Sequence, residues 1–165
     1  MRSLFAILFL TLLIVTAIFV LVTTASLPDP VATSFGGNGL AHAYMSRSAY
    51  RVYLLLFTIG LPLIVVAMIG WLPHFLPNRI NIPNRDYWLA PEHREQTLTF
   101  LSEHALRLGC LILVFMVGIQ WLVIRANTLT PPQLANRPFI ILLVGLFISI
   151  VGWILAIFRR FSRTR

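Results

Sequence analysis

The chain has 165 residues, of which 58% are hydrophobic and 11% are charged, whereas soluble domains have roughly 45–50% apolar and about 25% charged residues. This composition excludes a water-soluble globular domain. The 13 basic residues are all arginine, and with five acidic residues they give a formal net charge of +8. We interpret these arginines as charge at the edges of a membrane, where they set orientation and attract anionic lipid. We do not interpret them as a sign of a nucleic-acid partner.

Four long apolar runs carry no charged side chain: residues 4–22, 52–72, 108–124 and 139–158. All 18 charges therefore fall in the remaining 88 residues. One crossing of a bilayer takes about 20 apolar residues, and an arginine at mid-bilayer costs at least about 2.5–3.5 kcal/mol. The sequence predicts an all-α integral membrane protein, with one membrane domain over 1–165 and transmembrane helices at about 4–25, 52–72, 92–125 and 138–160.

The first apolar run has two interpretations. Arg2 precedes it and Thr23, Thr24 and Ala25 follow it, as in a cleaved signal peptide. Its apolar core exceeds the usual length of about 7–15 residues, so we favour a retained helix. In either case the loop after it, 26–50, lies outside the cytoplasm.

The outer loop 26–50 has more structure than a passive connector needs. Pro28 and Pro30 stiffen its start, Val31–Phe35 reads as a short strand, and the following Gly-Gly-Asn-Gly segment contains Gly39 and can take the positive φ of a tight turn. The loop therefore predicts a short β-hairpin at the outer surface.

Two patterns carry a resemblance to a known family. The outer loop has LPxxVAxxF, a glycine-containing turn and AxxYMSR before an apolar helix. The inner loop 73–91 contains most of the second pattern, NIPNRDYWLAPE, which ends at Glu92. Together they resemble a bacterial membrane domain family of unknown function that also forms the N-terminal part of SdpI-type immunity proteins. That family usually has a histidine before the phenylalanine and a lysine further on, where this chain has Ser34 and Arg47. The resemblance implies a helical membrane fold and an immunity-type role.

The inner loop leads into a long predicted helix. Pro91 and Glu92 suit a helix start, and an apolar stripe with 3–4 spacing runs from Leu98 to Ile112 without a glycine or proline before Leu108. We expect one unbroken helix from Pro91 to about residue 124. Glu103 and Arg107, four residues apart, are expected to form a surface ion pair on this helix.

The loops also supply the candidate interaction surface. Its residues are Phe35, Gly39 and Arg47 in the outer loop and Arg85, Asp86, Tyr87, Trp88, Pro91 and Glu92 in the inner segment. We expect Tyr87 and Trp88 at headgroup depth and Asp86 paired with Arg85, Arg94 or Arg79. The alternative is a set of solvated charges beside aromatic side chains that anchor the loop to the membrane.

Inside the predicted spans, Gln120 is the side chain that needs an interhelical hydrogen-bond partner. Pro62 is expected to kink its helix without ending it. With both ends inside, nine arginines lie in cytoplasmic segments and four in outer ones, so the positive-inside rule predicts that both termini are cytoplasmic.

No motif for a metal, cofactor or catalytic centre is present in the sequence. His93 and His104 are eleven residues apart on one predicted helix, about 16 Å along its axis, and cannot share an ion. A site with three ligands would require His74 to fold back onto Glu92 or Glu95. We therefore expect no metal, no cofactor and no enzymatic activity.

These observations favour a small multi-pass protein of the bacterial inner membrane. It is expected to act through contacts with membrane lipid and with another membrane protein or itself, in an accessory or immunity-type role. The alternative is an oligomeric small transporter or channel with a pore lined by Gln120, Thr58 and Ser149.

Overall fold

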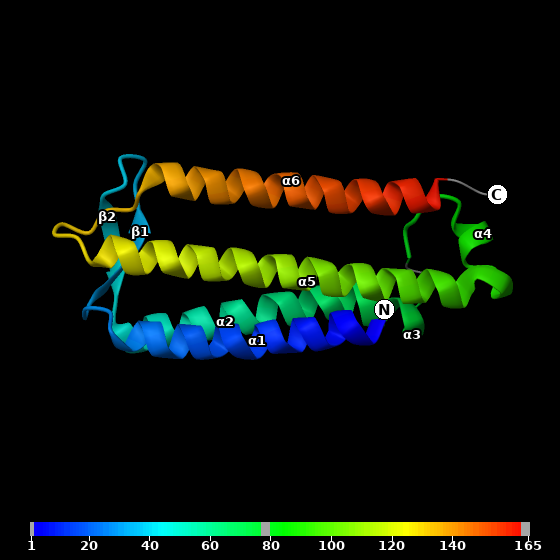
Figure 1. Ribbon diagram of the computed structural model, residues 1–165, viewed down its shortest axis with the longest axis horizontal. Helices are drawn as coiled ribbons and strands as arrows, with labels where there is room; N and C mark the ends of the chain where they lie inside the picture. The colour runs from blue at the N-terminus through cyan, green and yellow to red at the C-terminus, as the bar shows by residue number, and fades with distance from the viewer. Residues whose placement is uncertain (1, 77–79, 163–165) are drawn as a thin grey trace.

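The computed structural model describes residues 2–76 and 80–162, and most of them are helical. Within this part of the chain, long helices lie side by side, with a hairpin at one end and a short helix at the other (Figure 1). The elements in chain order are α1 Arg2–Ala25, β1 Val31–Phe35, β2 Ala41–Met45, α2 Arg47–Val66, η1 Ala67–Trp71, α3 Leu72–Phe75, α4 Arg85–Trp88, α5 Pro91–Asn127 and α6 Asn136–Phe161.

Four helical stretches of the described residues are long and apolar enough to cross a membrane. They are Leu4–Ala25, Arg47–Phe75, Pro91–Asn127 and Asn136–Phe161. The first of these ends at the predicted residue, and in its last turn the hydroxyls of Thr23 and Thr24 donate to the carbonyls of Phe19 and Val20, each at 2.7 Å. The predicted four-helix, all-α architecture with a small hairpin is thus present.

The second helix begins earlier than predicted. We expected it to start at 52, but α2 starts at Arg47, because the side chain of Ser46 caps it by accepting a hydrogen bond from the N–H of Ala49. Its first turn carries polar side chains, so the apolar run marks only the later part of the helix. The predicted outer loop 26–50 is correspondingly shorter. Pro62 lies inside α2 without ending it, as expected.

The π-helical segment η1 follows α2 and was not expected from the sequence. Its Gly70 is buried against α5, where a Cβ would lie 3.2 Å from the Cβ of Ala105. The carbonyl of Gly70 accepts a hydrogen bond from the Ser102 hydroxyl at 3.0 Å. Hydroxyl bonds of this kind satisfy carbonyls that a π-bulge releases from the regular helical pattern.

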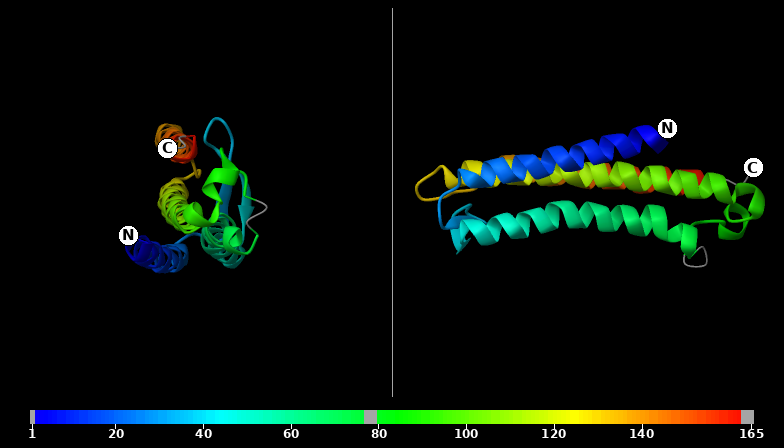
Figure 2. Two further views of the ribbon diagram at one scale, coloured as in Figure 1. Left: turned by 90° about the vertical axis from the view of Figure 1, so that its right-hand side faces the viewer. Right: turned by 90° about the horizontal axis from the view of Figure 1, so that it is seen from below.

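Helix α5 is the centre of the molecule. Its 37 residues form one unbroken helix of about 55 Å at 1.5 Å per residue, so the predicted continuous helix is confirmed. Figure 2 shows α1 and α2 on one side of α5 and α6 on the other. Helices α1 and α2 pack on α5 and on each other, whereas α6 packs on α5 without a comparable contact to α1 or α2.

Helix α6 uses only one narrow face for this packing. Its half-buried or buried residues recur at intervals of three or four, as expected of one stripe on a helix; they are Phe139, Leu142, Leu146, Ile150, Trp153, Ile157 and Phe161. The other faces are exposed and apolar from Ile140 to Phe158. The described residues form two separate cores. One lies around Val31, Tyr50 and Val123 near the hairpin, and the other lies around Trp88 and Phe161 near α4 and includes the end of α6.

Candidate interaction surfaces

The hairpin end of the molecule consists of β1, β2 and the connection 128–135 between α5 and α6. The strands pair antiparallel, with Val31 opposite Met45 and Phe35 opposite Ala41. The hairpin then bonds to the connection through the backbone: the N–H of Ala41 donates to the carbonyl of Pro132 at 3.2 Å, and the N–H of Leu134 donates to that of Gly39 at 2.8 Å. The hairpin is therefore attached to the start of α6.

Gly39 makes this attachment possible. Its φ is +80°, and a Cβ at this position would lie 2.6 Å from the carbonyl oxygen of Leu134. The predicted positive-φ turn is confirmed. Because Gly39 is buried between the hairpin and the connection, its role is to let two backbones approach, and it is not part of an exposed interaction surface.

Asn127 at the end of α5 provides a second attachment, which sequence reasoning missed. Its side-chain oxygen accepts from the N–H of Ala32 at 2.8 Å, and its nitrogen donates to the carbonyl of Ala32 at 3.0 Å. The amide thus pairs with β1 as a neighbouring strand would. An asparagine at the C-terminal end of an apolar helix was the only local signal in the sequence.

The other outer candidates, Phe35 and Arg47, also serve the fold. Phe35 packs beside the core that contains Val31 and Tyr50. The backbone N–H of Arg47 donates to the carboxylate of Asp29 at 3.2 Å, and its guanidinium donates to the carbonyl of Ala25 at 3.3 Å. Arg47 therefore links the end of α1 to the start of α2.

Gln120 on α5 bonds to side chains of α1 and α2, so the predicted interhelical hydrogen bond is confirmed. Its side-chain oxygen accepts from the Tyr50 hydroxyl at 2.6 Å, and its nitrogen donates to the Thr23 hydroxyl at 3.2 Å. Gln120 and Thr58 are each 1% exposed, whereas Ser149 lies on the exposed side of α6 and bonds to its own helix. These three side chains do not line a common channel in this chain.

At the α4 end, Trp88 is the centre of a side-chain clamp on α6. Its indole N–H donates to the carbonyl of Phe161 at 3.0 Å, and the Asn84 side chain donates to the same oxygen at 3.0 Å. The Thr97 hydroxyl in turn donates to the carbonyl of Trp88 at 2.8 Å. Trp88 is 6% exposed. Trp88 is therefore not available on the expected interaction surface, and its headgroup depth stays a prediction.

Aromatic and cationic contacts complete this clamp. The guanidinium of Arg160 lies 4.5 Å from the centre of the Trp88 ring and 5.9 Å from that of Phe100. Phe161 meets both rings edge-on, at 5.5 and 5.4 Å. Cation–π contacts of this kind contribute about 0.5–2 kcal/mol, so the clamp holds the last turn of α6 against α4 and α5.

The remaining inner candidates have mixed environments. Tyr87 is half-buried, with its ring 4.5 Å from that of His93, and Arg85 is also half-buried. Asp86, Pro91 and Glu92 are exposed. Asp86 lies in the first turn of α4, and its expected partner Arg79 lies outside the described residues. Among the described residues Asp86 forms no ion pair with Arg94, and its pairing with Arg85 or Arg79 stays a prediction.

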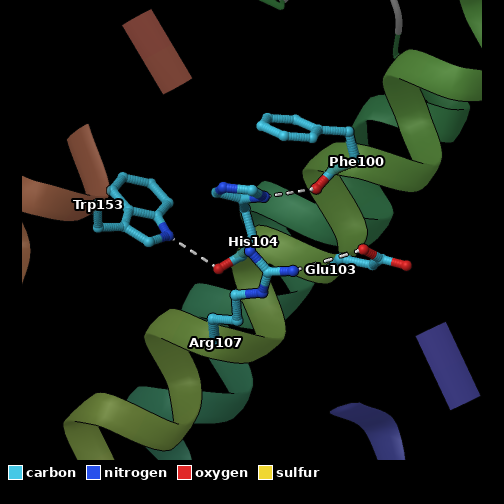
Figure 3. Close-up of polar contacts among 5 residues, drawn as sticks. All are labelled: Phe100, Glu103, His104, Arg107 and Trp153. Atoms are coloured by element: carbon cyan, nitrogen blue, oxygen red, sulfur yellow. Dashed lines mark hydrogen bonds and ion pairs between the residues drawn. The ribbon is translucent and has the colours of Figure 1, made fainter. Parts of the chain in front are cut away.

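A further contact ties the middle of α6 to α5 (Figure 3). The indole of Trp153 points from α6 to the backbone of α5 and donates to the carbonyl of His104 at 2.9 Å. The His104 ring stacks on Phe100 with ring centres 3.8 Å apart. On the same helix, the predicted pair of Glu103 and Arg107 is present at 3.7 Å.

Two of the cavities along α6 lie at the hairpin and near the clamp. One of about 480 Å³ is bounded by the hairpin, α5 and the first turns of α6, including Phe35, Leu122 and Phe139. The other, of about 260 Å³, lies near the clamp, between Leu72 on one side and Trp153 and Ile157 on the other. Both are mainly apolar, so they offer room for apolar groups beside α6.

No cluster of three or more potential metal ligands is found among residues 2–76 and 80–162. A site with three ligands would require His74 to lie near Glu92 or Glu95, and His74 and Glu95 do line one cavity.

Comparisons with protein-family models, with curated proteins and with solved structures found no match to this chain.

Proposed function

We propose that this protein is embedded in the bacterial cytoplasmic membrane, with four transmembrane helices, both termini in the cytoplasm and the hairpin end outside. Support comes from the apolar side chains exposed on all four spans, which water would not tolerate over so large a surface. The nine-to-four distribution of arginines supports this orientation.

Within that membrane, the protein acts through contacts with other proteins or lipid, in an accessory or immunity-type role. The observation that carries this proposal is α6, which is fastened at both ends yet packs on α5 by one stripe only. Its remaining faces present large apolar side chains, including Phe147 at 68% exposed and Ile148 at 63%. A helix positioned in this way is available to a partner.

The two sequence patterns support membership in the membrane domain family shared with SdpI-type immunity proteins. Residues of both patterns hold the attachments of α6 described above: Gly39 lies in the turn that follows the first, and Trp88 lies in the second. The patterns thus coincide with the parts of the chain that determine where α6 lies.

Single-cysteine labelling in a Cys110→Ser background tests the orientation. A cysteine at Ser34 in the hairpin is expected to react with an impermeant reagent in intact cells, and a cysteine at Ser162 only after permeabilisation. The reverse pattern would contradict the orientation.

Photocrosslinking and reconstitution test the mode of action. A benzophenone side chain at Phe147 is expected to crosslink to a membrane partner or lipid, whereas the same group at Phe9, which is 3% exposed, is expected to crosslink within the chain. Liposomes that contain the protein are expected to show no ion or solute flux. Flux that is lost on Gln120→Leu would overturn the proposal in favour of a channel.

A further inference from the structure

A further cavity, separate from those along α6, lies between α3 and the first turns of α5. Its volume is about 430 Å³, and its walls are His74, Pro91, Arg94, Glu95, Leu98 and Thr99. Unlike the cavities beside α6, it combines a cation, a carboxylate, an imidazole and a hydroxyl. This composition is typical of a site for a small polar group.

The polar groups of this cavity are not used by the fold. The Nδ1 atom of His74 is buried and has no hydrogen-bond partner among residues 2–76 and 80–162. Within the same described ranges, the side chains of Arg94, Glu95 and Thr99 form no hydrogen bond or ion pair. Buried polar atoms normally have a partner, and the imidazole nitrogen lacks one. Arg94 and Glu95 are exposed and Thr99 is half-buried, so the fold leaves these polar groups to a ligand.

The side chains on the cavity wall define the chemistry of that ligand. A guanidinium such as that of Arg94 binds phosphate through charge-assisted hydrogen bonds. The start of α5 at Pro91 adds the positive end of a long helix. Glu95 lies next in the chain and would repel a simple anion, but it suits an ammonium group. A phosphate with a primary amine a few bonds away satisfies both charges.

The surroundings indicate a lipid as the source of this group. At the same end of the molecule, Trp71 is 67% exposed, Phe75 77% and Leu76 42%. An exposed tryptophan beside apolar side chains is typical of the membrane–water interface. Acyl chains can lie against these side chains while the headgroup enters the cavity.

We propose that the cavity between α3 and α5 binds the phosphoethanolamine headgroup of a membrane phospholipid. The inference rests on the proposed membrane location of the protein. Arg94 and Thr99 hold the phosphate, Glu95 accepts hydrogen bonds from the ammonium group, and His74 bonds to a phosphate or glycerol oxygen. Leu98 borders the apolar part of the lipid.

Thermal unfolding of the purified full chain in detergent tests the proposal, because a ligand that binds the folded state raises the unfolding midpoint. Short-chain phosphatidylethanolamine is expected to raise the midpoint more than phosphatidylcholine or phosphatidylglycerol of the same chain length. Phosphatidylcholine lacks N–H donors for Glu95, and phosphatidylglycerol lacks the cation. Free phosphoethanolamine and inorganic phosphate distinguish a lipid from a soluble ligand and are expected to bind more weakly.

Two substitutions separate the two halves of the site. Arg94→Gln is expected to weaken phosphatidylethanolamine binding about tenfold, since it removes a charged hydrogen-bond donor to phosphate. Glu95→Gln is expected to abolish the preference for phosphatidylethanolamine over phosphatidylglycerol. Arg159→Gln is the matched control for Arg94→Gln, because Arg159 is likewise exposed and does not line the cavity.

The outcomes that overturn the inference are distinct from failure of the proposed function. Equal midpoints with all three lipids, inorganic phosphate binding as tightly as the lipid, or equal effects of Arg94→Gln and Arg159→Gln would each refute it. Flotation of the protein with liposomes after alkaline extraction is the separate check on membrane insertion. Protein that floats but shows no headgroup selectivity refutes the lipid site alone, whereas protein that does not float refutes the membrane proposal.

Discussion

The hairpin end and the α4 end both fasten α6 to α5, but they use different chemistry. At the hairpin end, backbone groups of Gly39, Ala41, Pro132 and Leu134 bond to one another, and the Asn136 side chain donates to the carbonyl of Gly37 at 3.0 Å. At the α4 end, the side chain of Trp88 bonds to the last turn of α6 and packs against it.

This difference determines how each end responds to substitution. Backbone bonds remain when most side chains change. The hairpin end is therefore sensitive where a Cβ does not fit and at Asn127 and Asn136, whose side chains bond to the backbone of the hairpin. A clamp made of side chains concentrates its energy in a few of them. We expect a single substitution to release α6 at the α4 end more completely than at the hairpin end.

The largest expected effect is that of Trp88→Ala. The substitution removes the packing on Phe161, the contact with Arg160 and the hydrogen bond to the Phe161 carbonyl, and buried Trp→Ala changes cost about 3–5 kcal/mol. Denaturant unfolding in detergent micelles measures this loss. The control Trp71→Ala, at a side chain 67% exposed, is expected to change stability by less than about 0.5 kcal/mol. A loss below about 1 kcal/mol for Trp88→Ala would remove the contrast between the ends.

At the hairpin end, Gly39→Ala is expected to cost about 1–3 kcal/mol, because alanine is strained at a φ of +80° and its Cβ meets the Leu134 carbonyl. Hydrogen exchange at the Leu134 N–H should accelerate as the hairpin separates from the connection. Gly37→Ala is the matched control, since a Cβ there has nothing within 4 Å. Equal exchange rates in both variants would show that the attachment does not depend on Gly39.

A smaller effect is expected for Tyr50→Phe. The change deletes the hydroxyl that donates to Gln120 and leaves the buried amide oxygen without this partner, at a cost of about 1 kcal/mol. Tyr53→Phe removes a hydroxyl from a side chain 54% exposed and should leave the unfolding midpoint unchanged. If the two variants unfold alike, the Tyr50–Gln120 bond contributes nothing to joining the helices.

The smallest expected effect is that of Glu103→Gln, which breaks the ion pair with Arg107 at 3.7 Å. Ion pairs four residues apart on a helix contribute about 0.3–0.5 kcal/mol and weaken with salt. The difference from the unsubstituted protein should be measurable at low salt and vanish at high salt. A salt-independent loss above about 1 kcal/mol would show that Glu103 stabilises the protein by something other than this ion pair.

The sequence alone was sufficient for features that depend on local pattern. The charge-free apolar runs predicted the long helices, the unbroken stripe from Leu98 predicted the continuity of α5, and the glycine-rich segment predicted the positive φ of Gly39. The start of α2 was predicted five residues late, because hydropathy does not register a helix that begins at a serine cap with polar side chains.

Only the tertiary structure decided which side chains are partners. Asn127 pairs with Ala32 across 95 positions, Trp88 with Phe161 across 73, and Tyr50 with Gln120 across 70. These contacts depend on how the helices pack and turn toward one another, which no local pattern specifies. For the same reason, the aromatic side chain of Trp88 was predicted at the surface but lies in the core, because α6 returns to cover it.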